Sequence, residues 1–251
     1  MRLEFSTWLQ VQDYFKRKDM VIIPVGSIEN HGTHLALGTD FLIPSHLVAQ
    51  LDQQLDVLFA PAMPFGVADH HIAYPGTISI GVDGLYLVLS KVVESLYNNG
   101  ARKFVFLNGH GGNDPVFNRI GLEMNQKGAL CAVLNWWSIA GEINPAWKGG
   151  HGGAEETSAM LAIHPDAVQL EAIHDLEPVN LSSELTFVSG NIVDCDGIKV
   201  PVPRLVNNFA APGWFGPDHP NTATVQWGEE MLEATVRFFV NFLEKFERVT
   251  L

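Results

Sequence analysis

The chain has 251 residues and a formal net charge of -13, and 47% of its residues are hydrophobic while 17% are charged. This size and apolar content are sufficient for one large α/β domain with a substantial core. The acidic balance argues against nucleic acid or anionic membranes as partners, since both require basic footprints. The two cysteines, Cys131 and Cys195, lie far apart, and the first residues contain charges without a long apolar stretch. We therefore expect no disulfide framework, no signal peptide, no membrane span and a cytoplasmic location.

Helix and strand patterns alternate along the first half of the chain. Apolar residues recur at three- and four-residue spacing over Gly84–Asn99, which is typical of a helix packed on a core. The apolar runs Val21–Val25 and Lys103–Leu107 indicate buried strands. The other elements expected in this half are a helix over Ser6–Lys16, a helix over Ile43–Leu55 with Pro44 in its first turn, a short strand over Val57–Ala60, a polar loop over Gly66–Thr77, and a helix from Asn113 or Asp114 to about Lys127.

The second half continues the alternation and adds an irregular excursion. The elements expected here are a strand over Ala129–Leu134, a Trp-rich loop over Asn135–Trp147, a helix that follows Gly149–Ser158 and runs through Ile163, a β-hairpin within Leu185–Val202, a Gly/Pro-rich loop over Ala211–Asn221, and a last helix over about Thr222–Phe246. Strands that alternate with helices predict a mostly parallel sheet with helices on both faces. Because no linker divides the chain, we expect a single domain over residues 1–251.

Groups able to bind metal follow the strands. Glu29, His31, His34 and Asp40 come directly after the first strand, and His110 lies in the loop Asn108–Asn113. His151, Glu155 and Glu156 come after the strand predicted over Ala129–Leu134 and the loop that follows it. Residues two apart in an extended segment point the same way, so Glu29 and His31 can address one point. Loops that follow parallel strands gather at one edge of the sheet. Mixed nitrogen and oxygen ligands favour Zn, Mn or Fe over Ca or Mg.

Other interpretations of these residues are weaker. The NGHGGN loop Asn108–Asn113 could cradle phosphate through its backbone, but it lacks the Walker lysine and the GxGxxG spacing. No G-x-S-x-G nucleophile elbow is present, and Cys131 lies inside a predicted strand. His70 and His71 could form a metal pair, although neighbours on a strand point to opposite faces, so at most one is expected to face the site.

The number of candidate ligands suggests two ions. Five candidates that include three or more carboxylates exceed what one tetrahedral Zn uses. A carboxylate that bridges two ions about 3.5–4 Å apart would hold a hydroxide between them, and this hydroxide is a nucleophile near neutral pH. The reaction class that follows is metal-assisted hydrolysis of an amide-like bond.

Four segments in order make the chain, from about Pro24 to Gly228, resemble the creatininase (creatinine amidohydrolase) family. They are the long signature Pro24–Asp40, the P-G-T-I segment Pro75–Ile78, the loop Asn108–Asn113, and the H-x-G-x-x-E-T-S segment His151–Ser158. The resemblance implies a three-layer α/β/α fold and a dinuclear Zn, Mn or Fe site at the strand ends. It also implies a small-molecule substrate and a homo-oligomer, namely a ring of six built from dimers.

The same resemblance assigns expected roles to single residues. Glu29, Asp40 and His110 would hold one ion, while His31, Asp40 and a last carboxylate would hold the other. His151 would act near the substrate as an acid/base or polarising group. The expected substrate contacts are the aromatic walls Trp137 and Trp147, together with His34, His71 and Gly111.

One departure from the family pattern affects the ligand set. Creatininase itself has a Tyr and a metal-binding Glu after the histidine of the second loop, where this chain has Gly111 and Gly112. The fifth ligand must then come from elsewhere, and the resemblance to family members with the all-glycine loop implies Glu156. Glu155 is the alternative; since neighbours on a helix differ in direction by roughly 100°, only one of the two can face the site. Losing both residues argues against creatinine itself as the substrate.

Members with the all-glycine loop resemble other amide hydrolases, including a formamidopyrimidine deformylase, a peptidase of the mycofactocin pathway and a keto-inositol hydrolase. We therefore expect an amidohydrolase that cleaves a small amide, formamide or cyclic amide. The alternatives are a metal-dependent hydrolase of a cyclic ketone and a non-catalytic relative that binds a small ligand. The apolar loop Phe209–Phe215 could cover a neighbour's site or act as a lid on its own.

Overall fold

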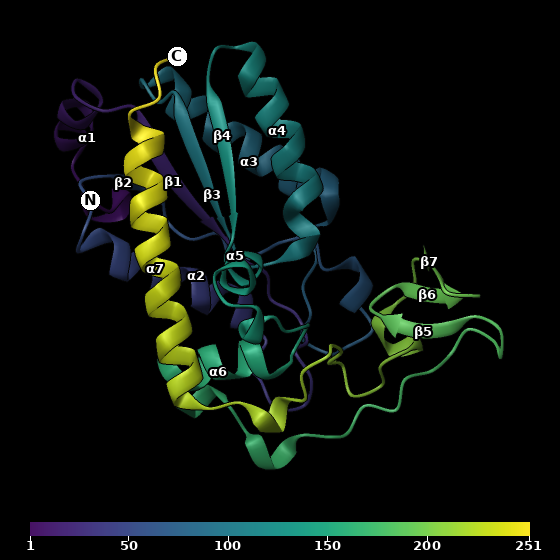
Figure 1. Ribbon diagram of the computed structural model, residues 1–251. Helices are drawn as coiled ribbons and strands as arrows, with labels where there is room; N and C mark the ends of the chain where they lie inside the picture. Colours follow the sequence, from purple (N-terminus) through teal and green to yellow (C-terminus); the bar gives the residue numbers. More distant parts are fainter.

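A four-stranded parallel sheet forms the centre of the molecule, and the computed structural model describes all residues, 1–251. Its strand order is β2-β1-β3-β4, and every pair of neighbours is parallel. The strands are β1 (Met20–Val25), β2 (Leu58–Phe59), β3 (Lys103–Asn108) and β4 (Leu130–Asn135). Their carboxyl ends point toward the same edge of the sheet (Figure 1), as the sequence predicts.

Seven helices surround this sheet. They are α1 (Trp8–Phe15), α2 (Thr39–Asp52), α3 (Gly81–Asn98), α4 (Asp114–Gln126), α5 (Trp136–Ile143), α6 (Ala154–Ile163) and α7 (Val225–Glu247). None of them is long and apolar enough to cross a lipid bilayer.

Side chains that alternate along the buried strands supply two cores. Ile22 and Val105 pack in one cluster with Phe239 of α7, while Val21 and Phe104 of the same strands pack with the residues of α3 and α4 in the other. All six residues of β1 and of β3 are buried, so each strand contributes to both faces. The predicted three-layer α/β/α architecture is confirmed (Figure 1).

A second sheet projects from the side of the body (Figure 1). It consists of β5 (Thr186–Ser189), β6 (Ile192–Cys195) and β7 (Ile198–Pro201), all antiparallel. The sequence predicted a two-stranded hairpin here, whereas the structure has a sheet of three strands. Asp196 and Gly197 turn the chain between β6 and β7 with φ values of 53° and 84°, and such left-handed residues suit a tight hairpin turn.

Two boundaries differ from the sequence prediction in ways that matter for the site. The expected Trp-rich loop is largely helix α5, which forms because fully buried Trp136 anchors it in the core. Helix α2 begins at Thr39, four residues before the predicted start at Ile43. Asp40 consequently lies in the first turn of a helix, at the edge of the sheet where β1 and β3 end.

Candidate metal centre and active site

A cavity of about 420 Å³ opens at the carboxyl edge of the central sheet. Acidic and imidazole groups dominate its lining, which contains no lysine or arginine. The lining residues are Glu29, Asp40, His70, His71, Gly109, His110, Gly111, Gly112, Trp137, Gly149, Gly150, His151, Glu155, Glu156 and Phe215. The predicted convergence of three chain segments on one point is thus present in the structure.

Asp40 connects two groups of ligand-type side chains. Its Oδ1 lies 2.9 Å from Nε2 of His31, and its Oδ2 lies 3.1 Å from Nδ1 of His110. Glu29 completes one group, with Oε2 3.0 Å from Nδ1 of His110, and Glu156 completes the other, with Oε2 3.7 Å from Nε2 of His31. In each group the ligand atoms lie within 4.8 Å of one another. The two sets therefore share one carboxylate.

Backbone carbonyls determine which ring nitrogen of two histidines faces this centre. Nδ1–H of His31 donates to the carbonyl of Glu29 at 3.1 Å, which turns Nε2 toward Asp40. Nε2–H of His110 donates to the carbonyl of Val67 at 2.8 Å, which turns Nδ1 toward the carboxylates. Such a partner on the far nitrogen is the usual support for a metal-binding imidazole.

The donor set fits a divalent cation. Nδ1 of His110 faces two carboxylate oxygens at 3.0 and 3.1 Å. Burial would lower the pKa of His110, but the carboxylates of Glu29 and Asp40 outweigh burial and raise it well above its ordinary value, so this point stabilises a positive charge. Oε1 of Glu29 and Oδ2 of Asp40 are buried and accept no hydrogen bond. Buried carboxylates without partners are costly, and a bound cation would remove that cost.

The electrostatics of the protein alone show the same excess of negative charge. Burial would lower the pKa of His31, but the carboxylates of Asp40 and Glu156 outweigh burial and raise it to about 10. Burial raises the pKa of Glu156 to about 7, with the nearby charge of Asp40 acting in the same direction and His31 opposing it. Both shifts indicate a site that holds a positive charge.

Of the two neighbouring glutamates on α6, Glu156 faces the shared centre. Its Oε2 also accepts the N–H of Gly152 at 2.7 Å. Glu155 belongs to neither ligand group; its Oε2 accepts the N–H of Gly149 at 3.2 Å, and burial together with the nearby charge of Glu156 raises its pKa to about 9. The geometry therefore favours Glu156 as the fifth ligand.

Gly112 shows why that carboxylate cannot come from the second loop. A Cβ at Gly112 would overlap the carbonyl oxygen of Val67 and Nε2 of His110. At Gly111 the nearest atom to a Cβ would be Cζ2 of Trp137, at 3.7 Å. The loop therefore has no room for a side chain at Gly112.

Histidines and aromatic rings form the rest of the cavity wall. His151 stacks on Phe215 with 5.1 Å between ring centroids, and Phe215 donates its N–H to the carbonyl of His151 at 2.8 Å. The loop that carries Phe215 thus covers the site of its own chain. Nε2 of His71 lies 3.4 Å from Oε1 of Glu29. Trp137 and Gly111 line the cavity as expected.

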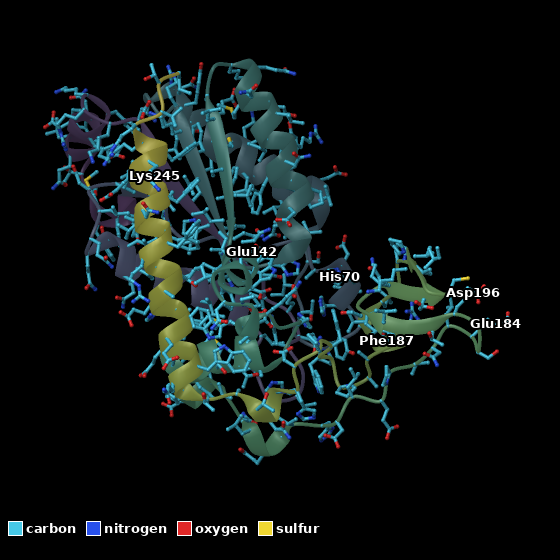
Figure 2. All side chains as sticks on the ribbon, viewed as in Figure 1. His70, Glu142, Glu184, Phe187, Asp196 and Lys245 are labelled. Atoms are coloured by element: carbon cyan, nitrogen blue, oxygen red, sulfur yellow. The ribbon has the colours of Figure 1, made fainter.

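His70 was missed because the rule for neighbouring residues on a strand was applied to the His70–His71 pair, although the segment was predicted to be a loop. Asp69–His71 is a 3-10 turn, in which consecutive residues do not alternate between two faces, so both histidines line the cavity. The ring of His70 stacks on that of His110 with centroids 5.9 Å apart. Figure 2 shows His70 on the side of the body that faces the small sheet.

Two expected substrate contacts lie outside the cavity lining. His34 is buried, with Nε2 3.0 Å from Oγ1 of Thr157. Trp147 packs against the core cluster on the α7 side of the sheet. Neither side chain lines the cavity.

The protein thus combines an α/β fold with a buried carboxylate–histidine centre of the kind that can hold metal ions. A comparison with family models matches residues 4–243 to Creatininase, described as creatinine amidohydrolase. The chain therefore belongs to the creatininase family of hydrolases.

Individual relatives support this membership. The chain is 26% identical over 254 residues to creatinine amidohydrolase from Pseudomonas putida, which covers 92% of this chain and 91% of that protein. It is 34% identical over 241 residues to mycofactocin precursor peptide peptidase from Mycolicibacterium smegmatis. This match covers 91% of this chain and 85% of that protein. A mutant creatininase of Zn–Zn type gives a TM-score of 0.78 at 23% identity and covers 99% of this chain and 98% of its own. Because the sequence identity to this solved structure is 23%, the likeness establishes the fold alone.

Proposed function

We propose that the protein hydrolyses the C–N bond of a small amide, formamide or cyclic amide with the help of two divalent metal ions. The observation that carries this proposal is the shared carboxylate of Asp40, whose two oxygens lie beside His31 and His110 in separate ligand groups. Glu29 and His110 would hold one ion with Asp40. The second ion would bind His31, Asp40 and Glu156.

The chemistry divides between the ions and the chain. When bound, two ions held in this way supply Lewis acidity at the substrate carbonyl and a hydroxide nucleophile near neutral pH. The chain keeps the ligands rigid, since the carbonyls of Glu29 and Val67 hold the two imidazoles and Oγ of Ser27 donates to Glu29 at 2.8 Å. Zn, Mn or Fe fits this mixture of nitrogen and oxygen donors, and one structural neighbour is a Zn–Zn creatininase.

His151 is the residue placed to move the proton. Its Nε2–H donates to the carbonyl of Asn30 at 2.7 Å, so the lone pair of Nδ1 faces Oε1 of Glu29, 3.8 Å away. Burial and the neighbouring His71 hold the pKa of His151 well below its ordinary value, so the ring is neutral. It would carry the remaining proton of the attacking hydroxide to the leaving nitrogen as the C–N bond breaks.

The cavity is of a size that suits a small molecule. It offers about 420 Å³, and the rings of Trp137 and Phe215 in its lining could contact a planar amide. The relatives named as a creatinine amidohydrolase and a peptide peptidase both cleave C–N bonds, which supports this reaction class. Formamides and small lactams are accordingly the first compounds to screen.

Metal content measured by elemental analysis tests the centre directly. Protein purified without chelator or nickel should hold about two ions per chain, and Glu156→Gln should hold about one. Glu155→Gln is the matched control, since it removes the neighbouring carboxylate outside both ligand groups and should keep two ions. Hydrolysis should stop with a chelator and return with Zn, Mn or Fe. Protein that binds no ion after incubation with these metals would refute the proposal and favour a binding protein.

A further inference from the structure

Asn113 is a fully buried amide that the helix beginning beside it does not use. It occupies the N-cap position of α4, yet its side chain caps none of the N–H groups of that helix. An asparagine at this position usually accepts such a hydrogen bond, and the sequence suggests Asn113 or Asp114 as the cap. Because a buried polar group is costly without partners, the side chain of Asn113 must be engaged elsewhere in the interior.

The amide group of Asn113 joins three segments around the metal centre. Its Oδ1 accepts the N–H of Val67 at 3.0 Å, and its Nδ2 donates to the carbonyl of Gly26 and to Oδ1 of Asn108, both at 3.2 Å. Because the N–H of Val67 can only donate and the carbonyl of Gly26 can only accept, a single orientation of the amide satisfies both. A Cβ on Gly66 would lie 2.6 Å from Oδ1 of Asn113, so the segment before Val67 packs directly against this amide.

Val67 connects the amide to a metal ligand. Its carbonyl accepts Nε2–H of His110 at 2.8 Å, which turns Nδ1 of that ring toward the carboxylates. Val67 belongs to no helix or strand, so hydrogen bonds from other segments determine where its carbonyl lies. Oγ of Ser79 holds the next peptide group by accepting the N–H of Ala68 at 3.0 Å. Asn113 supplies the corresponding anchor on the N–H of Val67 itself.

Asn108, the other asparagine of this loop, holds the backbone of the same histidine. Its Oδ1 accepts the N–H of His110 at 3.0 Å, and its Nδ2 donates to the carbonyl of His110 at 2.8 Å. Asn113 donates to that same Oδ1. The backbone of His110 and the carbonyl that holds its ring are therefore linked through one pair of buried amides.

We propose that Asn113 is a positioning residue, which keeps the ring of His110 directed at the metal centre through the backbone of Val67. The inference rests on the proposed metal centre, where His110 would bind one ion together with Glu29 and Asp40. An outer partner of this kind tunes the affinity for an ion without contacting it. Because His110 belongs to one of the two ligand groups that share Asp40, the effect should fall mainly on that ion.

Asn113→Ala tests this inference in the Glu156→Gln background, which should hold only the ion at His110. Competition with a chromogenic chelator should show binding weakened about tenfold, the low end of the range for outer partners, because the next peptide group keeps its own anchor. Ile120→Val is the matched control, since it removes one methyl group from a buried core residue farther along α4 and should keep the parent affinity. If the ion binds and both variants weaken it equally, or neither does, the inference is wrong.

A second readout needs no metal. In the metal-free full-length protein, NMR should show slow exchange of the Nε2 proton of His110 with water, because this proton is buried and bonded to Val67. Asn113→Ala should speed this exchange by about tenfold or more, whereas Ile120→Val should leave it unchanged.

The two readouts separate this inference from the proposed metal centre. Rapid exchange already in the wild type, or wild-type exchange in Asn113→Ala, would overturn the inference, and metal binding by the parent protein would still support the centre. If the wild type binds no ion but the exchange depends on Asn113, the metal centre fails and the positioning of the His110 ring stands.

Discussion

Replacing Gly112 with alanine should detach His110 from its backbone support without unfolding the protein. The new Cβ would overlap the carbonyl oxygen of Val67 and Nε2 of His110, and would lie 3.0 Å from Cδ2 of that ring, whereas ordinary contacts begin at 3.4 Å. The ring or the loop must therefore move, and the 2.8 Å hydrogen bond between His110 and Val67 is lost. Overpacking of this kind costs about 1–3 kcal/mol, and loss of such support lowers metal affinity about 10- to 100-fold.

The matched control for this variant is Gly111→Ala. Its Cβ would meet no atom closer than 3.7 Å, so metal affinity and stability should stay near wild type. Competition with a chromogenic chelator measures the affinity, and urea unfolding of the metal-free proteins measures the stability. Wild-type metal affinity in Gly112→Ala, or equal weakening by both variants, would refute the argument that this glycine positions His110.

Three further predictions concern the centre, a thiol and the core. Asp40→Asn should lose both ions, because Asp40 is the residue shared by both groups; retention of one ion would contradict the shared role. Burial raises the pKa of Cys131 from 9.0 to about 12, so a thiol reagent at pH 8 should modify native Cys131 slowly. For the same reason, the contribution of Cys131 to the free energy of unfolding should decline as the pH rises from 9.0 toward 12. Tyr14→Phe removes a buried hydrogen bond of 2.5 Å to the carbonyl of Met20 and should lower the free energy of unfolding by about 1 kcal/mol in a urea titration.

The parts of the fold and site that depend on local sequence pattern were predictable. Buried strands such as β1 and β3 can be recognised in the sequence as short apolar runs. Parallel topology then places the loops that follow them at one edge of the sheet. That argument correctly brought together Glu29, His31, Asp40 and His110. The role of Glu156 rested on the resemblance and on the direction of two neighbours on a helix. The cytoplasmic location and the six-membered ring stay predictions.

The parts that depend on tertiary contacts were not predictable in the same way. Helix α5 replaces an expected loop because buried Trp136 anchors it, and aromatic residues alone do not reveal such burial. His70 joins the cavity because its segment folds as a 3-10 turn, although two adjacent histidines suggested opposite directions. Phe215 covers the cavity through a backbone pairing with His151, which is remote in sequence.

The position of Asp40 shows how the motif combines ligands with packing. Pro44 has no N–H, so the carbonyl of Asp40 lacks its usual partner one turn later in α2. A Cβ at Gly26 or at Gly109 would overlap that same carbonyl oxygen. Because these glycines follow β1 and β3, the first turn of α2 can press between the two strand ends. Each oxygen of the Asp40 carboxylate then lies beside a different histidine, so Gly26 and Gly109 make room for the backbone that places this shared side chain.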